Sequence, residues 1–271
     1  MSFVLRRMCD NLWSGHLSLF PEDRLVHGFS ARLGGVSPAP FDTLNMALHV
    51  GDDPACVWEN RRRYFAALGL DAERICTIRQ VHGTEIVRAF RRDAGRGARD
   101  YADALADADA VITNDSGVAL MLCYADCVPV LLYDPVHNAT GLVHAGWRGT
   151  VQRIAAQTVA RMGEEFGTVP SDVLAGIGPS IGADCYTVGA EVADHFRTAF
   201  PAHADVIVLK QDGEIHLDLW AANCAQLVEA GVLEENIDRA DTCTSCDCAF
   251  FYSYRAAGGR TGRLTAVMEL R

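Results

Sequence analysis

The chain has 271 residues, of which 49% are hydrophobic and 22% charged, and its formal net charge is −11 at pH 7. This composition is typical of a globular protein with a sizeable core and excludes a disordered chain. The acidic balance argues against nucleic-acid binding. The one arginine-rich stretch, 88–99, is interrupted by glycine and aspartate, so we interpret it as a solvated loop.

No membrane or secretion signal stands out in the sequence. Residues 1–13 contain no apolar run long enough for a signal peptide, and no stretch reaches the roughly 18 apolar residues of a membrane span. We therefore expect a cytoplasmic protein with no membrane association. In such a protein the ten cysteines are expected to be buried thiols, metal ligands or nucleophiles.

Residues 57–70 form the first predicted helix, which ends at Gly69. Strand-like segments follow, and the central ones are almost continuously apolar, as expected of strands buried on both faces. These segments are 75–79, 85–90, 109–113, 118–123, 129–134 and 139–144. Their short spacing favours antiparallel hairpins over a simple doubly wound sheet.

The second half of the chain predicts both helices and strands. Thr150 is expected to cap a helix that runs to about Phe166, and Asp218 to cap a later one. The other predicted elements are a strand at 172–177, a helix at 189–199, and strands near 249–254 and 263–269. The whole pattern indicates an α/β fold, with a mixed β core covered by helices, in a single domain of residues 1–271.

Three short motifs each place a metal-ligand residue beside an apolar run and a small residue: Val81-His82-Gly83, Ala125-Asp126-Cys127-Val128-Pro129-Val130 and His144-Ala145-Gly146-Trp147-Arg148-Gly149. Two imidazoles and one thiolate suit zinc and leave a fourth position open, as in catalytic zinc sites. Copper also fits the ligand types, because it outranks zinc in raw affinity. The spacings are not those of zinc fingers, so a buried cysteine and two hydrogen-bonded histidines remain the alternative.

Candidate anion-binding residues lie near two glycine-rich turns. Arg148 precedes the predicted Thr150 helix, and helix N-termini attract anions. Arg32 precedes Gly34 and Gly35, a turn whose backbone N–H groups could approach a phosphate. Either arginine could instead form a surface salt bridge.

Two further features leave roles open. Asp126 adjoins the candidate thiol ligand, and it could act as a general acid or base or orient a ligand histidine. The cysteine-rich segment 243–248 suggests a second metal site. It has no matching Cys or His pair nearby in the sequence, so we interpret its cysteines as ordinary thiols.

The sequence resembles the laccase-domain, or purine nucleoside phosphorylase, family, first labelled polyphenol oxidoreductases. The blocks that carry the resemblance cover most of the chain: 27–37, 44–53, 80–83, 108–110, 125–130, 144–150, 178–182, 186–189, 243–244, 250–255 and 261–263. The resemblance implies a layered α/β/β/α fold, and zinc or copper bound by residues matching His82, Cys127 and His144. Asn45, in the second block, joins the two arginines as a candidate phosphate- or substrate-binding residue.

The activities that the resemblance implies are phosphorolysis of adenosine, inosine and methylthioadenosine, and hydrolytic deamination of adenosine. Some relatives are also linked to editing of peptidoglycan precursors. We expect a monomer that acts on small molecules, with Cys127, Asp126 and Arg148 as candidate catalytic residues. A zinc-bound water would attack C6 of adenine, or phosphate held by Arg32 or Arg148 would attack the ribose C1′.

Three alternatives remain beside zinc-dependent nucleoside chemistry. The chain has nine histidines and no His-x-His pair, so one site with two histidines and a cysteine does not build a multicopper oxidase; a copper-dependent polyphenol oxidase would need a mononuclear site. A metal-free hydrolase would use Cys127 as nucleophile and His144 or His82 as base. A nucleotide-binding module would bind without turnover.

Overall fold

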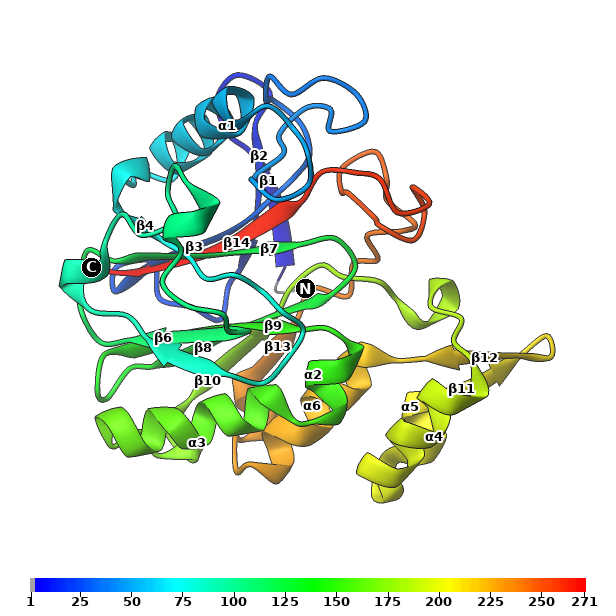
Figure 1. The fold of residues 1–271 in the computed structure, drawn as a ribbon. Coiled ribbons are helices and arrows are strands. Elements are labelled where there is room, and N and C mark those ends of the chain that lie inside the picture. The colour runs from blue at the N-terminus through cyan, green and yellow to red at the C-terminus, as the bar shows by residue number, and fades with distance from the viewer. Residues whose placement is uncertain (1–2) are drawn as a thin grey trace.

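The computed structural model describes residues 3–271, which form two six-stranded sheets packed face to face, with helices on both outer faces (Figure 1). This arrangement confirms the α/β class and the α/β/β/α layering. No helix in the described range is long and apolar enough to cross a bilayer.

The first sheet has the strand order β1-β2-β3-β14-β7-β4, with only the β4–β7 pair parallel. Its strands are β1 (Phe3–Arg7), β2 (Trp13–Leu17), β3 (Leu25–Ser30), β4 (Ile75–Cys76), β7 (Ala119–Tyr124) and β14 (Leu264–Leu270). The chain therefore builds this sheet from its two ends and its middle.

The second sheet has the order β13-β10-β8-β9-β6-β5, and its outer pairs, β13–β10 and β6–β5, are parallel. Its strands are β5 (Ile86–Arg88), β6 (Ala110–Thr113), β8 (Val128–Asp134), β9 (Ala139–Ala145), β10 (Leu174–Ile177) and β13 (Ile237–Arg239). A separate hairpin pairs β11 (Val208–Gln211) with β12 (Glu214–Leu217). The antiparallel β8–β9 hairpin confirms the predicted hairpin in the middle of the chain.

Helix α1 covers the first sheet, whereas α2, α3 and α6 lie against the second (Figure 1). The helices are α1 (Pro54–Ala67), α2 (Trp147–Val151), α3 (Ile154–Phe166), α4 (Ala190–Ala199), α5 (Ala204–Ile207) and α6 (Leu219–Glu229). Asp53 caps α1, and Asp218 caps α6 by accepting from the backbone of Ala221, as the sequence predicts for the latter.

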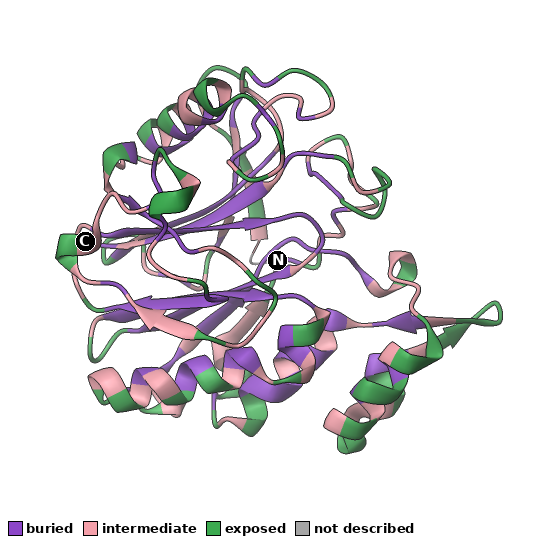
Figure 2. Cartoon of the chain, in the orientation of Figure 1, coloured by how far each residue is buried: buried purple, intermediate pink, exposed green. Residues whose placement is uncertain are grey.

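Three layers of apolar packing explain why the central strands are apolar on both faces (Figure 2). In β7, Leu120 and Leu122 contribute to the core between the sheets, while Ala119 and Met121 pack under α1. This alternation follows from the two-residue repeat of a strand.

Three sequence predictions are wrong in detail. Residues 249–254 form turns, because the backbone N–H groups of Phe250 and Phe251 both bond to the Asp247 carbonyl. Thr150 does not cap a helix but lies inside α2, which begins earlier, at Trp147. The predicted helix is also interrupted at Arg153, which has a left-handed backbone (φ 65°) and whose guanidinium bonds to the Ala199 carbonyl.

Several strands lack the patterns on which the predictions rested. No strand was expected before residue 57, yet β2 and β3 are central to the first sheet. Their sequences, WSGHL and LVHGFS, mix glycine, serine and histidine with apolar residues. The β11–β12 hairpin is also largely exposed at its tip and gives no apolar signal.

Candidate metal centre

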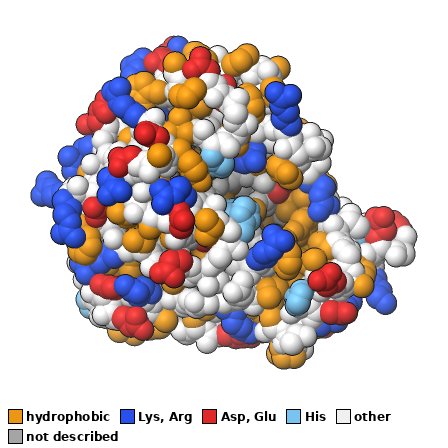
Figure 3. Space-filling view, in the orientation of Figure 1, with side chains coloured by type: hydrophobic (Ala, Val, Ile, Leu, Met, Phe, Trp, Pro, Cys, Tyr) orange, Lys and Arg blue, Asp and Glu red, His pale blue; other side chains and the backbone are white. Residues whose placement is uncertain are grey.

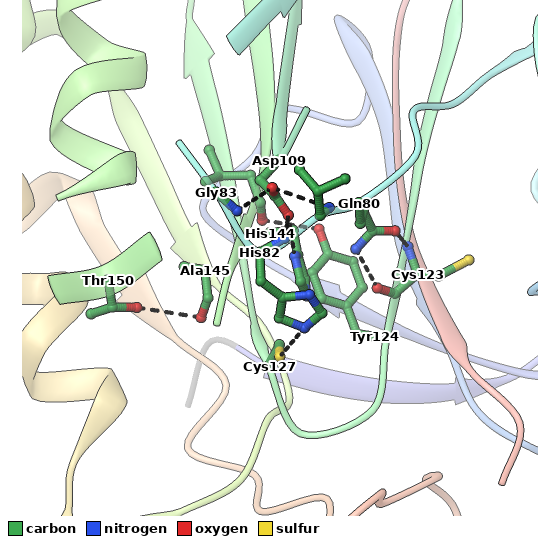
Figure 4. Close-up of polar contacts among 12 residues, drawn as sticks. Gln80, His82, Gly83, Asp109, Cys123, Tyr124, Cys127, His144, Ala145 and Thr150 are labelled. Carbon is green, nitrogen blue, oxygen red and sulfur yellow. Dashed lines mark hydrogen bonds and ion pairs between the residues drawn. The ribbon is translucent and has the colours of Figure 1, made fainter. Parts of the chain in front are cut away.

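The structure brings together the three predicted metal ligands, His82, Cys127 and His144, which we call the histidine cluster (Figure 4). One ligand atom from each lies within 4.8 Å of the others, and Cys127 Sγ is 4.0 Å from His82 Nε2. His144 is buried, Cys127 is half-buried and His82 is exposed. The cluster therefore opens to solvent on the His82 side.

Cys127 lies where the chain crosses from one sheet to the other. Strand β7 ends at Tyr124 in the first sheet, and β8 begins at Val128 in the second. The connecting turn is tight, and Asp126 adopts a left-handed backbone with φ 85°. This turn holds the thiol at the end of both sheets, where the chain passes from β7 to β8.

Asp109 clamps the loop that carries His82. Its carboxylate accepts hydrogen bonds from the backbone N–H groups of Val81, His82 and Gly83 at 3.2, 3.0 and 2.6 Å (Figure 4). His82 itself has a left-handed backbone with φ 60°, a conformation that few side chains adopt without support. The clamp therefore holds the His82 ring toward the thiol.

The same carboxylate orients the buried histidine. Asp109 Oδ1 lies 2.8 Å from His144 Nδ1, which leaves Nε2 free for a ligand. A carboxylate on the distal nitrogen is the usual support of a metal-bound histidine. Burial alone would raise the Asp109 pKa, but the bonds from His144, Gly83 and His82 outweigh it and lower the pKa.

The thiol and the buried imidazole favour each other's charged forms. Burial acts to raise the pKa of Cys127, but the charges and hydrogen bonds of His144 and His82 lower it to about 6. For His144, burial acts to lower the pKa, but Cys127 and Asp109 raise it to about 9. The arrangement thus stabilises a thiolate at neutral pH, the form that binds metals.

Gly146 forms the wall behind the cluster. A Cβ built there would lie 3.2 Å from both Cys127 Sγ and His82 Cδ2, and 4.0 Å from His144 Cε1. Its backbone, φ −69° and ψ 170°, is one that any residue can adopt. The glycine is therefore needed here for space and not for backbone freedom.

Arg148 supplies a positive charge near this end of the two sheets. Its side chain is exposed, with the guanidinium 4.6 Å from the centre of the Trp147 ring. Within residues 3–271 it makes no ion pair or side-chain hydrogen bond. Figure 3 shows histidine side chains beside a hollow near the middle of one face, with basic side chains next to them.

The other two predicted substrate residues are engaged in contacts with the protein. Arg32 donates to the carbonyls of Asp42 and Cys248 and pairs with the Asp42 carboxylate. The Asn45 amide makes four hydrogen bonds: its NH2 group donates to the Ala47 carbonyl and the Asp52 carboxylate, and its oxygen accepts from the backbone N–H groups of Ala47 and Arg263. Both side chains hold loops together in this structure.

Asp126 does not contact either ligand histidine. Its carboxylate accepts from Thr244 Oγ1 at 2.8 Å and from the backbone N–H of Arg255 at 2.7 Å. The role of orienting a ligand histidine belongs to Asp109, which the sequence analysis did not single out. Its only signal was its place in the 108–110 block of the resemblance.

A second group of possible metal ligands consists of Cys185, Cys243 and Cys246, which we call the thiol cluster. The expectation that segment 243–248 has no partner is therefore wrong, because Cys185 Sγ lies 3.3 Å from Cys246 Sγ. The two residues are 61 positions apart, and sequence spacing gives no hint of the contact.

The donor set of the histidine cluster fits zinc: two imidazole nitrogens and one sulfur, one histidine held by a carboxylate, and a side open to solvent. The two clusters are the only groups of this kind in the described range, and only one contains histidine. Each group offers three ligands, too few for a cluster of several copper ions.

Comparisons with known proteins place the chain in a family. Residues 26–271 match the family model described as multi-copper polyphenol oxidoreductase laccase. The chain is 42% identical over 247 residues to the protein named purine nucleoside phosphorylase YlmD of Geobacillus stearothermophilus, covering 91% of this chain and 90% of YlmD. It is 35% identical over 240 residues to a protein named adenosine deaminase RL5 from an unknown prokaryotic organism, covering 88% and 91%.

The fold agrees as well. The crystal structure of YlmD from G. stearothermophilus superposes with a TM-score of 0.92 at 40% identity, covering 95% of this chain and 96% of that one. Both the sequence and the fold are thus shared over nearly the whole length. The chain belongs to this laccase-domain family of enzymes, whose curated relatives carry purine nucleoside phosphorylase names.

Proposed function

We propose that the protein is a zinc-dependent purine nucleoside phosphorylase that acts on adenosine, inosine and methylthioadenosine, and that it also deaminates adenosine by hydrolysis. The observation that carries the proposal is the histidine cluster, open to solvent and held by Asp109, with Arg148, which makes no ion pair within residues 3–271, two positions after Gly146 in its wall. The names of its relatives agree with this chemistry. Zinc at the cluster would supply a Lewis acid and a water of lowered pKa.

The protein's own residues would hold the reactants in place. Asp109 fixes the His144 ring and the His82 loop, so three donors are already in position before any ligand binds. Arg148, exposed and free of ion pairs in the described range, would bind the phosphate. In phosphorolysis, a phosphate oxygen bonds to C1′ of the ribose as the bond from C1′ to the purine nitrogen breaks, so holding the phosphate near the sugar contributes much of the rate.

A metal-free cysteine hydrolase is the second candidate. Cys127, His144 and Asp109 form a thiol–imidazole–carboxylate row, with His144 Nδ1 2.8 Å from Asp109. This order resembles the nucleophile, base and orienting acid of cysteine hydrolases. The metal content of protein purified without added metal separates the two proposals, as does loss of activity on treatment with a chelator.

The decisive experiment uses adenosine with and without phosphate, and measures adenine, inosine and hypoxanthine by chromatography. The wild-type protein loaded with zinc should release adenine only with phosphate, and form inosine without it. Cys127→Ala should lose both activities, whereas Cys224→Ala, in α6 and outside both clusters, should keep them. No turnover by the wild type would contradict the proposal and favour a peptidoglycan precursor as substrate or a binding role.

A further inference from the structure

The thiol cluster lies on two turns that the fold brings side by side. Cys185 ends the short helix η5 (Ala183–Cys185), and Cys243 and Cys246 flank the turn Thr244-Ser245. The backbones of these segments are joined, since Ser180 N–H donates to the Thr242 carbonyl and Thr244 N–H to the Ser180 carbonyl. The three sulfurs are therefore brought together by the backbone as well as by their own contacts.

The geometry of the sulfurs suits one soft cation. All three lie within 4.8 Å of one another, and Cys185 and Cys246 are 3.3 Å apart. Sulfurs bound tetrahedrally to zinc, at about 2.3 Å each, would lie about 3.8 Å apart. Each sulfur would have to move by about half an ångström to reach that spacing. The Cys246 side chain is exposed, so it has room to move.

The turn around Cys243 has the features of a zinc-binding loop. Cys243 and Cys246 have the C-x2-C spacing that presents two sulfurs to one ion. A backbone N–H group also points at the Cys243 sulfur: Gly182 N lies 3.2 Å from it, and this group and the backbone of Cys246 and Ser245 lower the pKa of the Cys243 thiol. Such donors stabilise a thiolate, which is the form a metal needs.

We propose that Cys185, Cys243 and Cys246 form a second metal site, which binds a zinc-like soft divalent cation through three thiolates and leaves its fourth position to solvent. Binding would release the thiol protons to water. Cys248 is not a ligand, because its sulfur points to the carbonyls of Ser245 and Thr244, at 3.1 and 3.7 Å.

The position of this site gives it a structural role. Thr244, between two of the thiols, donates to the Asp126 carboxylate, and Ile181 N–H donates to the Asp126 carbonyl. Asp126 directly precedes Cys127. An ion on the thiol cluster would therefore fix the turns that support the Cys127 turn.

Cobalt(II) tests the proposal, because its thiolate complexes absorb in the near ultraviolet in proportion to the number of sulfurs bound. Reduced protein, freed of metal by a chelator, is titrated with cobalt under nitrogen. The wild type should bind two equivalents, and Cys127→Ser should keep one with strong sulfur absorption. Cys246→Ser, at an exposed position where folding is not threatened, should keep only the weakly absorbing one.

Two controls make the result decisive. Cys185→Ser should repeat the Cys246→Ser result, whereas Cys248→Ser, in the same turn, should bind two equivalents like the wild type. In Cys127→Ser, cobalt should also slow amide hydrogen exchange at residues 243–248. The proposal is overturned if Cys127→Ser binds no cobalt, or if Cys246→Ser still binds two equivalents.

Discussion

The histidine cluster and the thiol cluster each gather three side chains from distant parts of the chain, but different features hold them in place. In the first, the buried carboxylate of Asp109 accepts hydrogen bonds from the His144 ring and from the backbone of the His82 loop. The cysteine is held by a turn between two buried strands. In the second, no carboxylate is among the candidate ligands, and the backbone N–H of Gly182 donates to the half-buried Cys243 sulfur. The comparison suggests that the first cluster is arranged for reactivity and the second for holding loops.

The carboxylate of Asp109 gives the sharpest test of this difference. Asp109→Asn should weaken zinc binding at the histidine cluster by about 10- to 100-fold, because it removes the support of His144 and His82. Zinc binding at the thiol cluster should not change. Both affinities can be measured by competition with a chromophoric chelator, using Cys246→Ser and Cys127→Ser backgrounds.

A matched control exists at the end of β8. Asp134 accepts from the backbone of Val136 and His137 and lies 2.8 Å from His137 Nδ1, the same pattern outside both clusters. Asp134→Asn should therefore leave both affinities unchanged. An equal loss in the two variants would mean that the effect of Asp109 is general destabilisation.

The second prediction concerns Arg148, the exposed arginine two positions after Gly146 in the wall of the histidine cluster. Arg148→Ala should raise the phosphate KM of nucleoside phosphorolysis by about 10-fold, since a hydrogen bond to a charged group contributes about 1.5 kcal/mol or more. Arg32→Ala should instead lower thermal stability, because Arg32 joins the backbones of Asp42 and Cys248. An unchanged phosphate KM in Arg148→Ala would place the anion elsewhere.

The third prediction tests the space behind the histidine cluster. Gly146→Ala should weaken zinc binding there by about 3- to 10-fold, because a new Cβ 3.2 Å from Cys127 Sγ and His82 Cδ2 forces both ligands to move. Gly189, which also precedes a helix with an extended backbone (φ −75°, ψ 162°), has nothing within 4 Å of the Cβ position. Gly189→Ala should have no effect on zinc affinity, and an equal effect would assign the loss to the backbone.

The smallest effect is expected for the contact that joins the two clusters. Thr244→Val removes the 2.8 Å hydrogen bond to Asp126, whose carboxylate keeps its bond from the Arg255 backbone. The free energy of unfolding should therefore fall by about 1 kcal/mol. Chemical denaturation measures this. Thr242→Val, which loses only a bond to the Ala240 carbonyl, is the control for the change of side chain. Equal stability of wild type and Thr244→Val would show that the clusters are not coupled through this contact.

The sequence predicted what local pattern determines and missed what only the tertiary fold creates. His82, Cys127 and His144 were identifiable because each sits in a short motif at the end of an apolar run. Asp109 was not, because its role depends on contacts 27 and 35 residues away. The same reason hid Cys185, whose partner Cys246 is 61 residues away.

The same distinction separates the strands that were predicted from those that were missed. The apolar strands β7, β8 and β9 were predicted almost to the residue, because burial on both faces leaves a continuous signal. Strands β2 and β3, with glycine and histidine in them, gain their place from pairing with β14 and each other. The break at Arg153 likewise coincides with a bond to the Ala199 carbonyl, 46 residues away.

The crossing of the chain at Cys127 has a consequence for how this protein can change over evolution. His144 belongs to the second sheet, while Cys127 is suspended between β7 of the first and β8 of the second. Sliding one sheet over the other would therefore alter the distance between thiol and imidazole. Substitutions at Leu122 or Leu131, in the core between the sheets, must preserve this alignment as well as the packing. The packing between the two sheets is thus constrained by the distances that the histidine cluster requires.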